Sequence, residues 1–351
     1  MKNSPRTEKI HKLLDSTIVP PEALYEWPDK SDRLFHILKP LNEYFVQNCP
    51  KKLYKMRTVN ERSLQALENE YVFLTRADHF NDPYDCFLTF NVEELKERIA
   101  QYLSNESMEE TLAQNKIHFP VGELFPDKNS FLKIFEHQRT VFLQMSDQNL
   151  KEVSSDLQSN TYVASLTENI QSPVLWAHYA HNHEGFAIEY QFRSEMFCPR
   201  PMIVTNFDYP CYGWCSILPI HYSEFRADAT QLASWLALCK WTKFLFKEEY
   251  INYDLSPYLT DLLLKTKLCL KKSLDWAYEH EWRLMISHNW PNQIGADSSQ
   301  MPYPPSAIYL GERISDDNKK RLKEIAKRKS IPVYQMYINQ SGKKYQMEIG
   351  H

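Results

Sequence analysis

The stretch YEHEWRLM, residues 278–285, places two carboxylates and a guanidinium beside an apolar run. If this stretch is a strand, alternate side chains point to opposite faces of the sheet. The apolar face would carry Trp282 to the core, and the other face would carry Glu279, Glu281 and Arg283. Carboxylates in a dry, aromatic-walled setting can do acid–base work or stabilise a cation. The alternative is an ion pair at the surface of the sheet, which contributes little stability.

The stretch FNDPYD, residues 80–85, holds two further carboxylates around a proline. Pro83 forces Asp82 into an extended conformation, and the composition is typical of a turn. Asp82 or Asp85 could orient an arginine or a ligand hydroxyl from this turn. The alternative is a well-formed turn without a ligand, and the spacing does not support a metal pair.

Three histidines occur in WAHYAHNHEGF, residues 176–186. His178 and His181 share a helix face, and His183 lies past the helix end. HExxH is absent, so favourable placement at a helix C-terminus explains these histidines better than zinc does. Tyr179 and His183 remain candidates for the polar lining of a pocket, with His178 as a supporting residue.

Composition narrows the class of protein. The chain has 351 residues, a formal net charge of −4 and only 7 glycines. These values argue against broad binding to nucleic acid and against a glycine-rich phosphate loop. The 7 cysteines are odd in number and irregularly spaced, which indicates reduced thiols. The chain shows neither a signal core nor an apolar run that could span a membrane, so we expect a soluble cytoplasmic protein without a membrane partner.

The hydrophobic pattern predicts an α+β fold. We expect a single large domain with a mixed or antiparallel sheet, residues 51–351, preceded by a helical extension, residues 1–50. Residues 91–159 are polar and predict a helical insertion on one side of the sheet. Strands are predicted at 52–57, 71–75, 162–168, 186–190, 217–223, 281–287 and 306–311, with another strand after the turn in 80–90 and two more near the C-terminus. Helices are predicted at 31–45, 61–69, 172–185, 229–249, 256–272 and 315–329.

The order of these motifs resembles a bacterial family known as domain of unknown function 2971, over about residues 52–340. The family name implies no activity. The motifs that carry the resemblance are LYKMR (53–57), FNDPYDCF (80–87), ASLTE (164–168), LWAHYAHNHEGFAIEY (175–190), IHYSEFRAD (220–228), KSLDWAYEHEWRLM (272–285) and IYLGERI (308–314).

A second resemblance is to arginine-type mono-ADP-ribosyltransferases. These enzymes carry an early Arg, a Ser-Thr-Ser stretch and a late Glu-x-Glu pair, and Arg57, Ser165-Leu166-Thr167 and Glu279-His280-Glu281 follow the same order. Leu166 departs from this pattern. The resemblance implies that Arg57 binds NAD, that Ser165 and Thr167 support the nicotinamide side, that Glu281 stabilises the oxocarbenium ion and that Glu279 activates the acceptor.

We therefore expect an NAD-using ADP-ribosyltransferase or NAD-glycohydrolase-like enzyme with NAD as substrate, no metal and an unknown macromolecular acceptor, in a phage-defence or stress setting. Two alternatives stay open: a non-catalytic ligand-binding or effector module, and a metal-dependent nuclease built on Asp82, Asp85 and Glu281.

The leading hypothesis also makes a geometric prediction, because a ligand cleft requires distant polar groups to converge. Arg57 should lie near a carboxylate, Ser165 near Glu281, and Arg283 should pair with an acidic residue. At least five of seven residues should line one pocket, namely Arg57, Asp82, Asp85, Tyr179, His183, Glu281 and Arg283.

Overall fold

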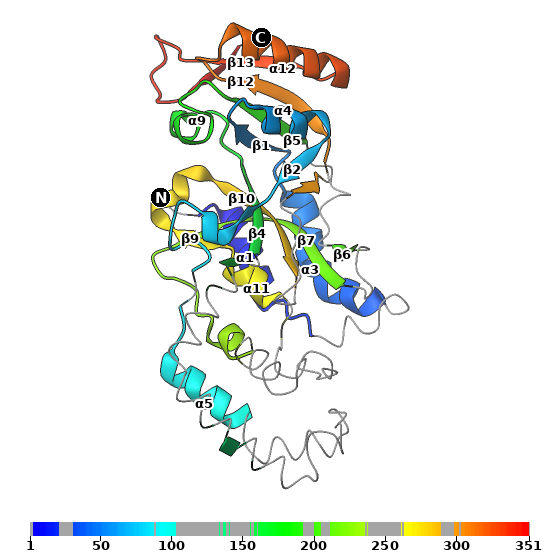
Figure 1. Ribbon diagram of the computed structural model, residues 1–351, viewed down its shortest axis with the longest axis vertical. Coiled ribbons are helices and arrows are strands. Elements are labelled where there is room, and N and C mark those ends of the chain that lie inside the picture. Colours follow the sequence, from blue (N-terminus) through cyan, green and yellow to red (C-terminus); the bar gives the residue numbers. More distant parts are fainter. Residues whose placement is uncertain are drawn as a thin grey trace.

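The computed structural model describes residues 3–20, 31–87, 89–102, 161–191, 200–204, 211–235, 261, 263–288, 298–301 and 303–350, with a few isolated residues between 133 and 159 and residue 237. Of the insertion predicted at 91–159, nearly all residues after 102 lie outside this part of the chain, and so does the helix predicted at 229–249 beyond residue 237. Figure 1 shows the sheet from β13 and β12 at the top to β10 and β7 in the middle, with α12 beside the C-terminal strands.

The fold is α+β, as predicted, and its centre is a large, mostly antiparallel sheet. The strand order is β14-β13-β12-β5-β1-β4-β10-β7-β6, and β3 pairs with β4 as well. In the described part of this sheet, β12 and β13 are the one parallel pair. The strands are β1 (Lys52–Arg57), β3 (Thr75–Arg76), β4 (Thr161–Thr167), β5 (Phe186–Gln191), β6 (Arg200–Val204), β7 (Cys211–Pro219), β10 (Glu281–His288), β12 (Pro305–Leu310), β13 (Val333–Tyr337) and β14 (Glu348–Gly350). Two small pairs accompany the sheet: β2 (Tyr71–Phe73) with β11 (Ser298–Gln300), and β8 (His221–Ser223) with β9 (Lys271–Ser273).

Apolar clusters cover both faces of the central strands. Phe186 and Ile188 of β5 belong to the largest cluster, whereas Ala187 between them belongs to a second one. Alternate residues of a strand point to opposite faces, so β5 is covered by apolar side chains on both sides. Met56 of β1 joins the second cluster with Trp176.

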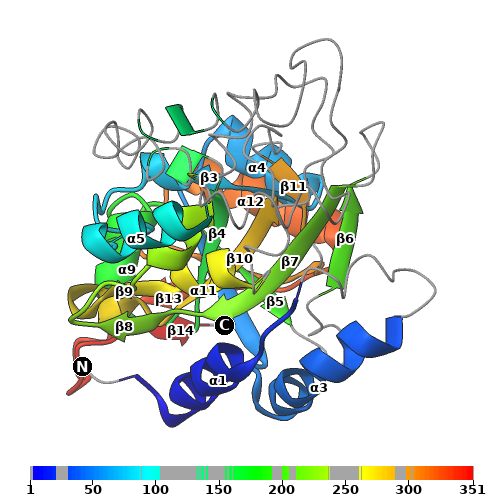
Figure 2. The ribbon, with the colours of Figure 1, turned by 90° about the horizontal axis from the view of Figure 1, so that it is seen from below.

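Most of the described helices pack around this sheet, whereas α5 (Val92–Tyr102) lies away from it (Figure 1). The helices are α1 (Pro5–Ser16), α3 (Ser31–Asn48), α4 (Glu61–Glu68), α5, α9 (Pro173–Tyr179), α11 (Leu264–Leu268) and α12 (Asp316–Lys329), with 3-10 helices η1 (Ala77–His79) and η5 (Leu274–Glu279). Figure 2 shows α1 and α3 together at one side of the molecule. Ile10 of α1 and Leu41 of α3 are buried in the same cluster as the sheet, so this N-terminal pair of helices is packed onto the core.

Several sequence predictions differ from the structure. In the described part of the helix predicted at 256–272, only Leu264–Leu268 form α11, and β9 begins at Lys271. The strand predicted at 71–75 is divided between β2 and β3. The helix at 172–185 ends at Tyr179, because residues 181–183 adopt positive φ angles that a helix cannot continue through. The segment 80–90 is a turn without a following strand among its described residues; Cys86 has a φ of 55° and only Thr89 forms an isolated bridge. Glu279 belongs to η5 rather than to the strand, and His280 ends that turn with a φ of 45°.

None of the helices in the described residues is long and apolar enough to cross a membrane.

The docking of α1 gives a pH-dependent contribution to stability. His11 of α1 is 3% exposed and its Nε2 lies 2.8 Å from the carbonyl oxygen of Pro219. Burial lowers the pKa of His11 from 6.5 to about 4. As the pH falls, His11 therefore binds a proton in the unfolded chain before it does so in the folded one. The stability that neutral His11 contributes is present above pH 6.5 and is lost as the pH falls toward 4.

We expect the free energy of unfolding to fall by about 3 kcal/mol from this group as the pH drops through that window. In His11→Gln the fall should be smaller. Urea unfolding at pH 4.5 and pH 7.5 measures both values, and an equal fall in the two proteins would contradict the assignment.

Candidate functional site

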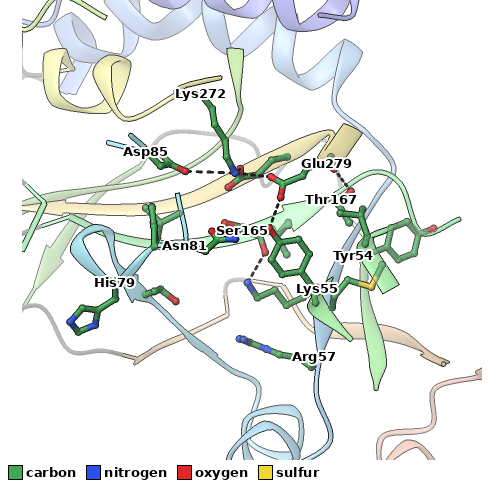
Figure 3. A pocket seen from close by; sticks show the side chains of 18 of the residues that line it. Tyr54, Lys55, Arg57, His79, Asn81, Asp85, Ser165, Thr167, Lys272 and Glu279 are labelled. Carbon is green, nitrogen blue, oxygen red and sulfur yellow. Dashed lines mark hydrogen bonds and ion pairs between the residues drawn. The ribbon is translucent and has the colours of Figure 1, made fainter. Parts of the chain in front are cut away.

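A pocket opens where the sheet separates between β1 and β4. The two strands are paired at Tyr54 and Thr167, and farther along the same edge β4 is paired with β3 at Val163. Between these two points β1 diverges from β4. The space between them is a pocket of about 310 Å³, lined by β1, β4 and the segments that carry Asp85, Lys272 and Glu279 (Figure 3).

One wall of the pocket is a buried network of three carboxylates and two cations. The Nζ atom of Lys272 lies 2.7 Å from Glu279 Oε2, 3.0 Å from Glu281 Oε2 and 3.6 Å from Asp85 Oδ2. Figure 3 shows Lys272 between Asp85 and Glu279. Arg283 donates from Nε to Glu281 Oε1 at 2.9 Å and from an Nη atom to Asp85 Oδ2 at 2.5 Å. Because all five side chains are at most 6% exposed, this is a core network and not a surface ion pair.

The two glutamates of this network have different electrostatic surroundings. Burial alone would raise the pKa of Glu281, but Arg283 and Lys272 outweigh it and hold that pKa well below its usual range. Burial raises the pKa of Glu279, and the nearby Glu281 raises it further, against the lowering effect of Lys272. Opposite shifts in the pKa values of two neighbouring carboxyl groups are typical of acid–base pairs. Glu281 stays ionised, and Glu279 is the member of the pair with the raised pKa and so the better proton acceptor.

Hydrogen bonds from three elements fix the two glutamates. The hydroxyl group of Tyr179, at the end of α9, donates to Glu279 Oε1 at 2.5 Å. Thr167 donates to the carbonyl oxygen of Glu279, and the backbone N–H of Glu281 donates to the Tyr222 hydroxyl at 2.8 Å. Ser165 and Thr167 lie opposite Arg283 and Glu281 in the β4–β10 register, on one face of the sheet.

The other wall carries two cations without a carboxylate partner. Lys55 and Arg57 lie two residues apart on β1 and share a face. Lys55 Nζ donates to the carbonyl oxygen of Ser165 at 2.7 Å. Among the described residues neither side chain forms an ion pair. Burial lowers the pKa of both groups, and for Lys55 the charge of Arg57 lowers it further.

Gly185 allows the chain to pass close to Arg57, the last residue of β1. A Cβ atom at Gly185 would lie 2.2 Å from the carbonyl oxygen of Arg57, which is far inside van der Waals contact. Only a glycine lets the chain before β5 pass this closely to Arg57.

The structure brings most of the predicted site residues together. Seven of them line the pocket: Arg57, Asp85, Ser165, Thr167, Tyr179, Glu279 and Glu281. Arg283 lies behind the pocket and holds Asp85 and Glu281, as its predicted pairing requires. Ser165 is close enough to Glu281 that a hydrogen bond from its side chain contributes to lowering the pKa of that carboxyl group.

Other predictions about the site are wrong. Only four of the seven residues expected in one pocket line it, one fewer than the minimum we expected. Arg57 has no carboxylate partner in the described part of the chain. Asp82 caps its own turn by accepting from the backbone N–H of Tyr84 at 2.9 Å. His183 and His178 do not line the pocket, because the chain leaves the helix at Tyr179 and His178 turns to the ring of Tyr278.

Sequence reasoning missed Lys272 and Lys55. Lys272 opens the motif KSLDWAYEHEWRLM, seven residues before Glu279, but it lies on β9, and no periodicity in the sequence relates β9 to η5. Lys55 stands two residues before Arg57 in an ordinary strand pattern, which gives it no distinguishing signal in the sequence. Two cations on one strand face without nearby acidic residues in the sequence could have suggested it.

The described residues contain no group of three or more His, Cys, Asp or Glu side chains that could hold a metal ion. The network shows why this applies to Asp85 and Glu281: Arg283 and Lys272 occupy the space between their oxygens. The donor set therefore favours ligands that bind by charge and hydrogen bonds.

No curated protein and no solved structure matches the chain. In particular, these comparisons give no support to the resemblance to ADP-ribosyltransferases. One family model matches part of the chain, residues 175–284, which is shorter than the span of 52–340 expected from the motifs. This part includes Tyr179, Lys272, Glu279, Glu281 and Arg283. Over residues 175–284, the chain matches the family described as "Protein of unknown function (DUF2971)".

Proposed function

We propose that this pocket binds NAD and cleaves its bond to nicotinamide, transferring ADP-ribose to an acceptor or to water. The observation that supports the proposal most is the pair of glutamates whose pKa values are moved in opposite directions on one wall. Across from them lie Lys55 and Arg57, two cations that form no ion pair with a described residue. Cleavage of a glycosidic bond needs a fixed negative charge beside the developing cation and a second group that handles a proton.

The proposed roles follow from these surroundings. Nicotinamide would leave with the electrons of the glycosidic bond, and ionised Glu281 would stabilise the oxocarbenium ion. Glu279 would accept the proton of the attacking acceptor or water, so that the products are nicotinamide, the ADP-ribosyl adduct and one proton. Arg57 would attract the diphosphate. Pockets for small molecules measure about 300–1,000 Å³. At about 310 Å³ the pocket suits the nicotinamide riboside half, with the adenylate at its mouth.

The structure also offers one observation in favour of a non-catalytic binding module. Both carboxylate oxygens of Glu281 already accept from Arg283 or Lys272. A carboxylate neutralised in this way could serve only to shape the pocket for a ligand. A metal-dependent nuclease finds no support, since Asp82 is turned to its own backbone and cations fill the space between Asp85 and Glu281.

Incubation with NAD labelled in the adenylate half separates these functions. The purified chain is incubated with and without cell extract and with EDTA. Label on a macromolecule identifies a transferase, and free labelled ADP-ribose identifies a glycohydrolase. Intact NAD that co-elutes with the protein identifies a binding module, and cleavage of nucleic acid that EDTA abolishes identifies the nuclease.

Tyr179→Phe should shift the pH dependence of NAD cleavage. The Tyr179 hydroxyl stabilises the ionised form of Glu279 and thereby lowers its pKa, against burial and Glu281, which raise it. Loss of the hydroxyl raises that pKa, so the pH at which the rate reaches half its maximum should move to a higher value. The rate is measured between pH 4 and pH 9. If the pH of half-maximal rate on the acidic side is the same in both proteins, Glu279 is not the base.

A further inference from the structure

The pocket contains two lysines whose surroundings are opposite. Lys272 contacts two carboxylates within 3.0 Å and its ammonium lies over the ring of Trp276, 4.9 Å from the centroid. Glu281 and Glu279 raise the pKa of Lys272 against the effect of burial. Lys272 therefore stays protonated and has no lone pair with which to attack a ligand.

Lys55 has none of these stabilising contacts among the described residues. Within that part of the chain its Nζ atom has one hydrogen-bond partner, the carbonyl oxygen of Ser165 at 2.7 Å. The nearest charged group of its own strand is another cation, Arg57, and Glu281 attracts it only from beyond ion-pair distance. Burial first and Arg57 second lower the pKa of Lys55 well below its usual range. Desolvation beside a second cation is the setting that makes a lysine amine a nucleophile.

We propose that Lys55 is the reactive amine of the pocket and captures a small carbonyl compound that carries an anionic group, by forming an imine. Neutral Nζ would attack the carbonyl carbon, and the carbinolamine would lose water, which takes the carbonyl oxygen and both amine hydrogens. The Ser165 carbonyl oxygen accepts one N–H and so restricts the nitrogen lone pair to two directions.

Arg57 sets the class of ligand. Its side chain extends from β1 in the same direction as that of Lys55 (Figure 3) and is half-buried without an ion-pair partner in the described residues. A guanidinium in a partly dry pocket is stabilised by an anion. An aldehyde with a carboxylate or phosphate would therefore place its charge at Arg57 and its carbonyl at Lys55. This inference does not depend on NAD cleavage.

The test is trapping by sodium borohydride, which reduces an imine to a stable secondary amine. The full chain is incubated with glyoxylate at pH 7, reduced and digested, and each lysine adduct is quantified by mass spectrometry. Lys51 and Lys52 serve as internal references because they stand on the same segment, with Lys51 exposed and Lys52 paired with Glu189. We expect half-modification of Lys55 at a glyoxylate concentration at least tenfold lower than for either reference.

Acetaldehyde, which has no charge, should show a smaller preference for Lys55. Lys55→Arg, checked by circular dichroism to be folded, should lose the preferred adduct and keep those on the references. Modification of Lys55 no stronger than that of Lys51 would overturn the proposal, and equal preference with acetaldehyde would overturn the role of Arg57. Because trapping is measured without NAD, its outcome is independent of whether the pocket cleaves NAD.

Discussion

Glu281→Gln should reduce the rate of NAD cleavage at least about a hundredfold while the protein stays folded. The substitution keeps the size of the side chain and an acceptor oxygen for Arg283, but it removes the negative charge beside the developing oxocarbenium ion. Asp85 and Glu279 still neutralise Arg283 and Lys272. Release of nicotinamide by equal amounts of folded protein measures the rate.

Glu189→Gln is the matched control for this variant. Glu189 is 1% exposed and accepts hydrogen bonds from Lys52 at 2.9 Å and Tyr309 at 2.7 Å, but it does not line the pocket. We expect this variant to cleave NAD at nearly the wild-type rate. Equal losses in the two variants would mean that Glu281 acts through stability alone.

Arg283→Met should destabilise the protein by about 3–5 kcal/mol. The guanidinium donates to Glu281, to Asp85 and to the carbonyl oxygen of Cys269, and it is 1% exposed. Its loss leaves two buried carboxylates with Lys272 as their remaining cation. The free energy of unfolding in urea measures the change.

A surface ion pair provides the contrast. Arg321 of α12 pairs with Glu61, and their side chains are 42% and 74% exposed. Arg321→Met should change the free energy of unfolding by less than about 1 kcal/mol, because water and salt screen such a pair. A similarly small change for Arg283→Met would contradict a buried network.

The sequence predicted correctly the features that depend on a single helix or strand. The helix predicted from residue 61 begins there as α4, and Asn60 forms a capping box with Ser63 at its start. Period-two alternation placed Glu281 and Arg283 on one face of a strand, and the pairing of Arg283 with Asp85 follows from the cost of burying a charge alone.

What sequence reasoning missed depends on contacts between elements that lie far apart in the chain. His178 and His181 were expected to share a helix face, but α9 ends at Tyr179 and three consecutive positive φ angles, at residues 181–183, redirect the chain. Lys272 completes the network through the pairing of β9 with β8, which no local pattern specifies. The pocket itself exists because β1 leaves β4 after one residue pair, and such a divergence has no signature in either strand.

The most direct test of the central claim is the amount of free nicotinamide that the purified, full chain releases from NAD over time in the presence of EDTA. The proposed function predicts that nicotinamide accumulates beyond one equivalent per protein molecule, or reaches this level only after an acceptor is added. NAD that binds and is recovered intact, with and without cell extract, would contradict cleavage and leave a pocket that only binds its ligand.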